Sequence, residues 1–225
     1  MKRPYTKSVS CVKIHRTQMS TETKRRYEKR ARAAHEEATR LRIVEAALEL
    51  HGTVGPAATT ISAIAERAGV RRATVYRHFP DERALFASCS GMFRERNPVP
   101  DPAAWASIEE PAERLAVALD AIYGWYERVE PALTAILRDV DRMPILREIQ
   151  QAGRLAYLAA VEDGLVSGWG ARGKAAKRLR AAVALALDFH AWQALHGRGL
   201  ERGEAVGVMS SAVAAAASRA GARAT

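Results

Sequence analysis

The chain has 225 residues, of which 48% are hydrophobic, and a formal net charge of +10. Its length suits one small domain and one larger domain. The two cysteines, Cys11 and Cys89, form no Cys-x-x-Cys pair, which argues against a disulfide framework and a structural zinc site. A charged start without a following apolar segment, and the lack of about 18 uninterrupted apolar residues anywhere, argue against a secretory signal and a membrane span. We expect a cytoplasmic protein with no membrane partner.

The positive charge is concentrated at one end of the chain. Residues 1–100 hold 20 basic and 10 acidic residues, whereas residues 101–225 hold 15 of each. Residues 1–35 alone hold 11 basic and 2 acidic residues, a net of +9. This segment is polar and poor in core residues, so we expect a flexible basic arm that touches a polyanion, or else a solvated tail. Met19 is an alternative to Met1 as the start of translation.

Strand patterns are nearly absent, and helix-forming residues dominate, so the sequence predicts an all-α fold. A first helix is expected over about residues 36–51, with Leu41, Val44 and Leu48 as its apolar stripe. Residues 52–58 read as a loop. Thr59 or Thr60 is placed to cap a second helix.

Residues 60–79 have the spacing of a helix-turn-helix. Ala65 allows the two helices to approach, Gly69 stands where a left-handed residue is needed, and Val75 fills the gap between the helices. Pro80 ends the second of these helices, and Asp81 is placed to cap a further helix to about Arg96.

A proline-rich break at residues 97–102 marks the expected domain boundary, with a helix-turn-helix domain over 36–97 and a helical domain over 98–225. Apolar spacing predicts helices over residues 111–129, 131–142, 144–166, 174–196 and 200–220, which makes nine in total.

Three segments carry a family resemblance. They read Ala65-Glu66-Arg67-Ala68-Gly69-Val70, Thr74-Val75-Tyr76-Arg77-His78-Phe79-Pro80 and Ala84-Leu85-Phe86. Residues 38–93 thereby resemble the DNA-binding domain of the tetracycline-repressor (TetR) family of bacterial transcriptional regulators, which also uses nine helices. The Tyr-x-His-Phe-Pro ending makes the match specific, and the alternative is a buried helical hairpin without a nucleic-acid role.

The predicted recognition helix, at about residues 71–78, is expected to enter the major groove. Arg71, Arg72 and Thr74 are assigned to base edges, where arginine can read guanine with two hydrogen bonds. The resemblance implies phosphate contacts by Tyr76, His78 and Thr60. The family often has a serine cap where Arg71 stands and a lysine where Glu82 stands, so Arg83 is the expected substitute for that lysine. Two copies in a homodimer should read a near-palindromic operator, with reading helices about 34–36 Å apart.

The C-terminal domain is expected to bind a small apolar effector, because aromatic residues suit such a pocket as well as they suit a core. The candidate ligand residues are Trp105, Tyr123, Tyr126, Tyr157, Phe189, His190 and Trp192. The apolar stripes of the last two predicted helices are the candidate dimer interface, formed by Leu179, Val183, Leu187, Val206, Met209 and Val213.

Two other patterns have plain explanations. Residues 168–173 satisfy G-x-G-x-x-G, but the preceding segment is helical, so we interpret them as a link between helices. Asp188, His190 and His196 lack a Glu-x-x-His partner, so no metal or other cofactor is predicted. The favoured function is a non-enzymatic repressor released by a ligand. The alternatives are a helical-bundle enzyme, which would carry a metal or cofactor, and a charge-driven DNA-binding protein without a preferred operator.

Overall fold

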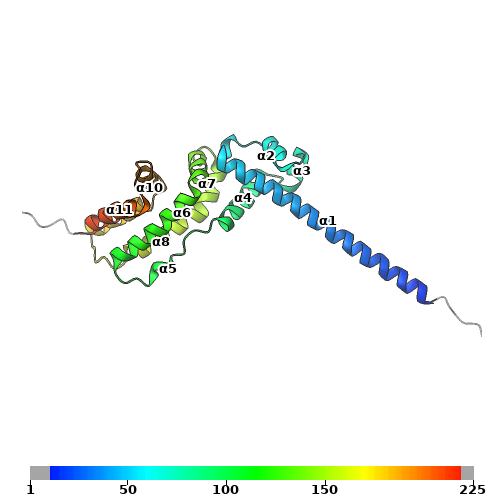
Figure 1. The fold of residues 1–225 in the computed structure, drawn as a ribbon, viewed down its shortest axis with the longest axis horizontal. Coiled ribbons are helices and arrows are strands. Elements are labelled where there is room, and N and C mark those ends of the chain that lie inside the picture. Colours follow the sequence, from blue (N-terminus) through cyan, green and yellow to red (C-terminus); the bar gives the residue numbers. More distant parts are fainter. Residues whose placement is uncertain (1–10, 219–225) are drawn as a thin grey trace, which may run out of the picture.

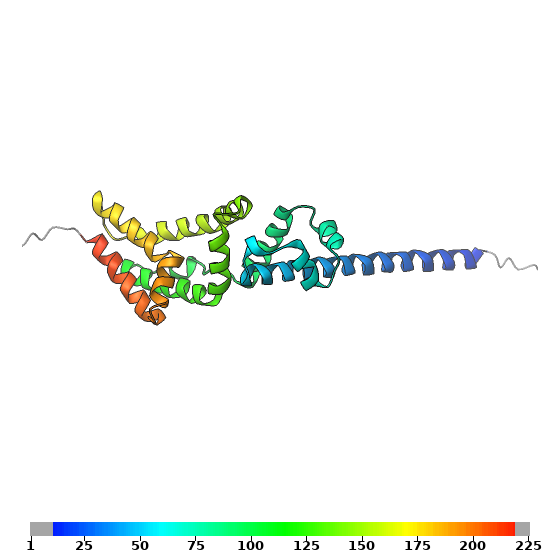
Figure 2. The same ribbon diagram turned by 90° about the horizontal axis from the view of Figure 1, so that it is seen from above.

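The computed structural model describes the backbone of residues 11–218 and the side chains of residues 21–149 and 153–218. All elements within residues 11–218 are helical, which confirms the all-α prediction (Figure 1). A long N-terminal helix projects from one end of the molecule, and the helices of the last third lie at the other end (Figures 1 and 2).

The first helix is much longer than predicted. Helix α1 spans Cys11–Thr53, so it begins well before the expected start near Glu36, and residues 11–35 are not irregular as we expected of an arm. Residues 1–10 of the predicted arm lie outside the described residues. The side chains of residues 21–38 are all exposed, so local helix propensity, and not packing, forms this part of α1.

The C-terminal part of α1 faces a core that differs slightly from the predicted stripe. Ile43, Val44 and Ala47 are buried, whereas Leu41 remains 42% exposed. They pack with α2 (Ile61–Ala68), α3 (Arg72–His78) and α4 (Glu82–Arg96) to form the small N-terminal domain. A 3₁₀ turn, η1 (Pro56–Ala58), connects α1 to α2.

The predicted break after α4 is present, because residues 97–102 form no helix before the short α5 (Ala103–Ala106). Helix α6 then runs through Pro111–Asp139, where we predicted two helices separated near Pro131. Pro131 is exposed, while Val129, Leu133 and Ile136 are buried on either side of it. Burial along one continuous face therefore outweighs the single backbone hydrogen bond that a proline removes.

The next predicted helix, over residues 144–166, is divided into three parts. Helix α7 (Pro144–Gln150) passes through a π-helical turn, η2 (Gln151–Leu155), into α8 (Ala156–Val166). The glycine-rich residues 168–173 then link α8 to α9 (Lys174–Ala186), as the sequence predicted, and no strand precedes them.

The predicted helix over residues 174–196 is broken at Leu187 and Asp188 into α9 and α10 (Phe189–His196). The Asp188 carboxylate caps α10 by accepting hydrogen bonds from the backbone of His190 at 2.9 Å and Ala191 at 3.0 Å. Helix α11 spans Arg202–Ala217, so the predicted end at Ala220 lies outside the described residues.

The predicted dimer residues are instead part of the core of one chain. Helix α11 packs along α9 and α6, and all six side chains are at most 9% exposed in the single subunit. These six residues are Leu179, Val183, Leu187, Val206, Met209 and Val213. Their place in a dimer interface stays a prediction, and their burial within one subunit leaves little of their surface for a partner.

Candidate nucleic-acid interface and internal cavity

The turn between α2 and α3 has the predicted geometry. Gly69 adopts φ 66° and ψ 39°, the left-handed conformation that favours glycine. Its backbone N–H donates to Glu66 O at 3.1 Å, and the Val70 N–H donates to Ala65 O at 2.9 Å. This pair of bonds is a Schellman motif, which satisfies the last carbonyls of α2 and redirects the chain into α3.

Burial and exposure on α3 divide the helix into two faces. Val75 is fully buried between the two helices and Phe79 is 5% exposed, with the Arg40 guanidinium 5.6 Å from the centre of the Phe79 ring. Arg71 and Arg72 are exposed, and so is Tyr76, at 49%. The inner face therefore fixes the helix in place, and the outer face carries donors free to meet a ligand.

The remaining predicted DNA contacts are placed less uniformly. Thr74 is half-buried, and so is His78, whose Nε2 atom is covered and has no hydrogen-bond partner among the described residues. The Thr60 hydroxyl caps α2 by accepting from the Ala63 N–H at 3.1 Å. A phosphate contact of His78 would thus need its other ring nitrogen, and Thr60 already has a structural task.

The N-terminal caps of α3 and α4 agree with the sequence predictions. Asp81 caps α4 by accepting from the Ala84 N–H at 2.7 Å, as predicted. Arg71, at the N-cap of α3, makes no capping side-chain bond, which agrees with the expected loss of a serine cap. Arg83 pairs with Glu148 of α7 at 2.5 Å, so this candidate phosphate contact is engaged with the C-terminal domain.

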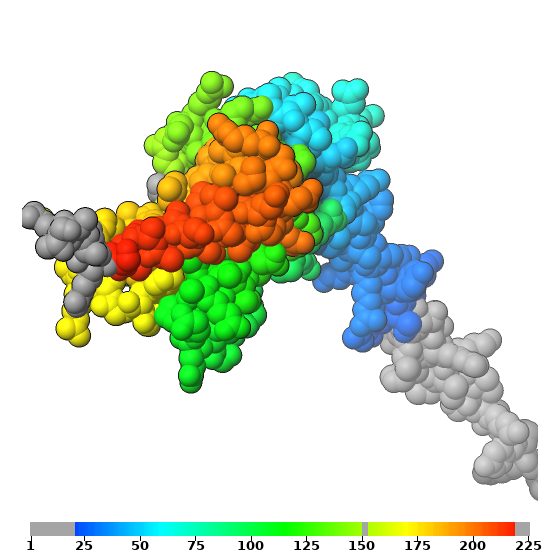
Figure 3. Space-filling view, turned by 60° about the vertical axis from the view of Figure 1, so that its left-hand side comes forward, coloured from blue at the N-terminus to red at the C-terminus, as the bar shows by residue number. Residues whose placement is uncertain are grey.

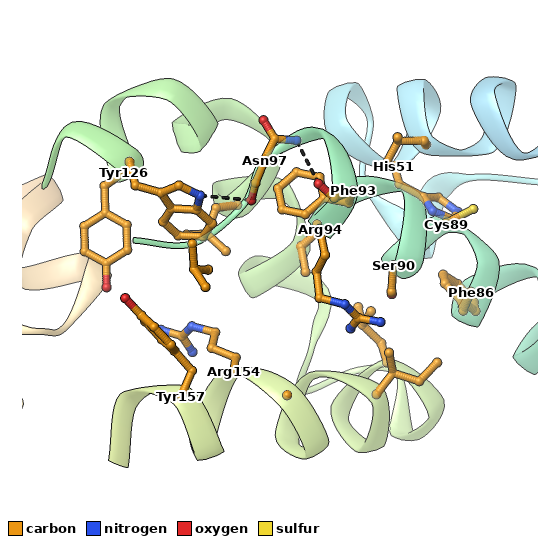
Figure 4. A pocket seen from close by; sticks show the side chains of 18 of the residues that line it. His51, Phe86, Cys89, Ser90, Phe93, Arg94, Asn97, Tyr126, Arg154 and Tyr157 are labelled. Carbon is orange, nitrogen blue, oxygen red and sulfur yellow. Dashed lines mark hydrogen bonds between the residues drawn. The ribbon is translucent and has the colours of Figure 1, made fainter. Parts of the chain in front are cut away.

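A cavity of about 180 Å³ lies where the two domains meet (Figure 4). Its walls come from α1 and α4 on one side and from α6, α7, η2 and α8 on the other. Most of the lining is apolar and includes Phe86, Ile136 and Leu146, which pack together as a separate cluster. A bound molecule would therefore contact both the DNA-binding helices and the C-terminal helices.

Two of the seven predicted ligand residues, Tyr126 and Tyr157, line this cavity. Trp105, Tyr123, Phe189 and Trp192 do not line it and are buried in the C-terminal core, while the side chain of His190 is exposed. These five residues are therefore outside the lining of this cavity, and ligand contacts by them stay a prediction. The aromatic content of the domain could not distinguish a lining residue from a core residue.

Tyr123 and Tyr126 also satisfy the backbone at the break between α9 and α10. The Tyr123 hydroxyl donates to Ala186 O at 2.9 Å, and the Tyr126 hydroxyl donates to Leu187 O at 2.6 Å. Burial raises the pKa of both phenols, so they remain protonated donors. The sequence pattern contained no sign of this role, because the break in the helix was not predicted.

Polar links hold the two domains together beside the cavity. The buried Asp139 carboxylate, at the end of α6, accepts from the Ala57 N–H at 3.0 Å. Arg138 donates to Val54 O at 2.8 Å. Hydrogen bonding to Arg138 holds the pKa of Asp139 below its usual value, so Asp139 is ionised at neutral pH.

Within the described residues, no helix combines the length and the apolar character needed to cross a bilayer. The described side chains also contain no group of three or more His, Cys, Asp or Glu arranged to hold a metal ion.

Comparison with known proteins places the DNA-binding segment in a family. Residues 43–89 match the family described as bacterial regulatory proteins, tetR family. No curated protein matches the chain.

Solved structures share the fold over most of the chain. A transcriptional regulator from Rhodococcus sp. Rha1 is 20% identical, with a TM-score of 0.52, and the alignment covers 77% of this chain and 95% of that one. A tetR-family transcriptional regulator from Streptomyces coelicolor is 19% identical, with a TM-score of 0.51 and 80% of each chain covered. At these identities the likeness concerns the fold.

The helix-turn-helix geometry and the family match together confirm the resemblance seen in the sequence. The fold is shared with transcriptional regulators, and residues 43–89 match the tetR family of bacterial regulatory proteins. Together they support a DNA-binding regulator.

Proposed function

We propose that the protein is a homodimeric repressor that a small apolar ligand releases from a near-palindromic operator. The observation that carries this proposal is the position of the cavity, whose walls belong to both domains. A ligand that fills the cavity contacts α4 and the end of α1, which are packed against the reading helices. Binding can thus change how the DNA-binding domain sits on the C-terminal domain.

The operator side of the proposal rests on the outer face of α3. Arg71 and Arg72 are exposed at the start of that helix, where arginine can read guanine, and Tyr76 is exposed one turn later. The net charge of +9 over residues 1–35 adds attraction to DNA. Because these exposed side chains of α3 can contact base edges, a sequence-specific regulator is favoured over a protein that binds DNA by charge alone.

The dimer is proposed because one reading helix contacts too few base pairs for useful specificity. We propose the outer faces of α9 and α11 as its surface, because their inner faces are covered within the subunit. These outer faces expose Leu185 at 57% and Val208 at 48%. Helix α11 lies across the surface of the subunit (Figure 3), so a second copy can reach it.

The deciding experiment selects bound sequences from random double-stranded DNA with the purified protein. We expect an enriched site with two inverted half-sites centred about one helical turn apart. Recovery of DNA without any enriched sequence would contradict the proposal and favour charge-driven binding. If a specific site is found but no small molecule dissociates its complex with the protein, the proposal of a sequence-specific regulator stands and the proposal of release by a ligand is contradicted.

A further inference from the structure

The charged groups around the cavity are of one sign. Among the described residues of its lining, only Arg94 of α4 and Arg154 of η2 carry a formal charge at neutral pH, and none is an Asp or Glu. Within the described residues, neither guanidinium is paired with a carboxylate. The lining of the cavity therefore carries two positive charges that no Asp or Glu of the lining balances.

The two arginines line the cavity from facing walls, Arg94 from α4 and Arg154 from η2. Arg94 reaches toward η2, where its Nη1 atom lies 3.7 Å from the position that a Cβ would occupy on Gly153. Arg154 is the next residue, and its guanidinium lies near the Tyr126 hydroxyl, whose pKa it lowers against the larger raising effect of burial. Figure 4 shows Arg154 beside Tyr157 on one wall of the pocket, whereas Arg94 extends toward that wall from α4. A π-helical turn such as η2 is rare and is often found at functional sites.

The other polar groups of the cavity are neutral or already bonded. Burial lowers the pKa of His51 to about 4 and raises that of Cys89 to about 12, so neither is charged at pH 7. The Tyr126 hydroxyl donates to Leu187 O, and the Tyr157 hydroxyl donates to Pro100 O at 2.9 Å. The guanidiniums are therefore the charged donors left for a ligand.

The far side of the cavity is apolar. It is formed by Leu48, Phe86, Ile136, Leu146 and Ile149, and the His51 ring stacks on Phe86 with 4.9 Å between ring centres. The volume of about 180 Å³ exceeds the roughly 150 Å³ that accommodates benzene in an engineered cavity. A hydrocarbon chain or ring of this size has matching surface there.

We propose that the effector is an apolar monocarboxylate, with its carboxylate between Arg94 and Arg154 and its hydrocarbon part against the apolar side. A cation in this place would meet two like charges without an acidic partner, and a neutral ligand would leave the guanidinium donors unused. An anion compensates both charges when the site closes over it. This assignment of a ligand class rests on the ligand-controlled function proposed above.

The test uses three probes of equal chain length that differ in their head group: octanoate, octan-1-ol and octylammonium. A change in tryptophan fluorescence reports binding to the full-length protein at pH 7.5, because Trp125 lines the cavity. Octanoate should bind at least about tenfold more tightly than the alcohol, the size expected for a charge-assisted hydrogen bond. Octylammonium should bind weakest of the three.

Arginine variants locate the head group. Arg154→Met and Arg94→Met keep much of the side-chain length and remove the charge, so each should reduce the preference for octanoate over octanol about tenfold or more. Arg172→Met is the matched control, because Arg172 is exposed in the loop before α9 and does not line the cavity. Thermal unfolding of each variant checks that the fold is kept.

Preferential binding of octanol or octylammonium, an unchanged preference in both cavity variants, or no octanoate binding at millimolar concentration would each overturn the proposal. Release of operator DNA is measured separately with the same probes. Selective octanoate binding without DNA release would support the ligand class and contradict the release mechanism. Release by the alcohol or amine would support the mechanism and contradict the ligand class.

Discussion

Single residues at the domain junction are constrained by both domains at once. Gly55 has φ 95°, and a Cβ placed on it would lie 2.5 Å from the Asp139 Oδ2 atom and would also meet the Arg138 guanidinium. Asp139 cannot retreat without breaking its bond to the Ala57 N–H. Gly55, in the loop after α1, therefore leaves the space that Asp139 at the end of α6 needs for its hydrogen bond to Ala57.

Gly55→Ala is expected to destabilise the protein through two effects. Gly55 combines φ 95° with ψ 154°, a region essentially restricted to glycine that costs another residue about 1–3 kcal/mol, and displacement of Asp139 adds about 1.5–3 kcal/mol for a bond to a charged group. Gly170→Ala is the control, because Gly170 has φ 65° but no atom near the added Cβ. Urea unfolding of the two variants gives the difference, and equal destabilisation would show that the contact with Asp139 contributes nothing.

Arg72 is the residue on which base reading can be tested most directly. Arg72→Ala should cost about 1–3 kcal/mol on the selected operator and relax the choice of base at one position in each half-site. The free energies of binding to operator and to random DNA are compared by fluorescence anisotropy. An equal decrease on both DNAs would reassign Arg72 to a phosphate contact.

His51 makes the stability of the protein depend on pH. Its pKa is about 4 in the folded state because the ring is buried, whereas an exposed histidine titrates near 6.5. Between these two pH values His51 is protonated in the unfolded chain and neutral in the folded protein. The free energy of unfolding should therefore fall as pH decreases from about 6.5 to 4. His51→Phe keeps a ring against Phe86 and should flatten this slope in urea titrations. A variant with the wild-type slope would place the acid sensitivity elsewhere.

At the scale of elements, α1 combines a buried half with an exposed one. The sequence between Pro4 and Gly52 contains no proline or glycine, so nothing interrupts a helix once it has begun. We expected irregular structure for residues 11–35 because they have little to bury. The helix continues there because Arg, Lys, Glu and Ala favour it locally.

Deletion of residues 1–35 should leave the melting temperature and the selected operator unchanged, since the exposed half of α1 adds nothing to the described core. Affinity for DNA should decrease. The slope of log K against log salt should flatten by about 0.9 for each phosphate that the deleted segment had neutralised. An unchanged slope would show that this basic segment does not touch DNA.

At the scale of the whole molecule, the cavity is lined by helices of both domains, from α1 and α4 to α6 and α8. Three polar contacts surround this junction. They join Ala57 to Asp139, Val54 to Arg138 and Arg83 to Glu148. A molecule in the cavity can therefore act on the reading helices through neighbouring contacts, without a long path through either core.

The proposed dimer is tested on the outer faces of α9 and α11. Leu185→Glu combined with Val208→Asp should keep the helical content and yield monomers, because charge is placed only on exposed positions. Val117→Asp is the control, since Val117 is 41% exposed on α6. Analytical ultracentrifugation measures the assembly state. Dimers that persist in the double variant would move the interface to another surface.

The sequence by itself determined the all-α class, the helix-turn-helix and its family, because these depend on local spacing. Gly69, Val75 and Asp81 act within a few residues of their neighbours, so their roles could be predicted and are confirmed. The tertiary structure alone decided which apolar residues face a cavity, a core or solvent. Arg94 and Arg154 are distant in the sequence and line one cavity only because α4 packs against α7. Likewise, Leu179 and Val213 are ordinary apolar residues in the sequence, and only the packing of α9 on α11 shows that their surface is already covered.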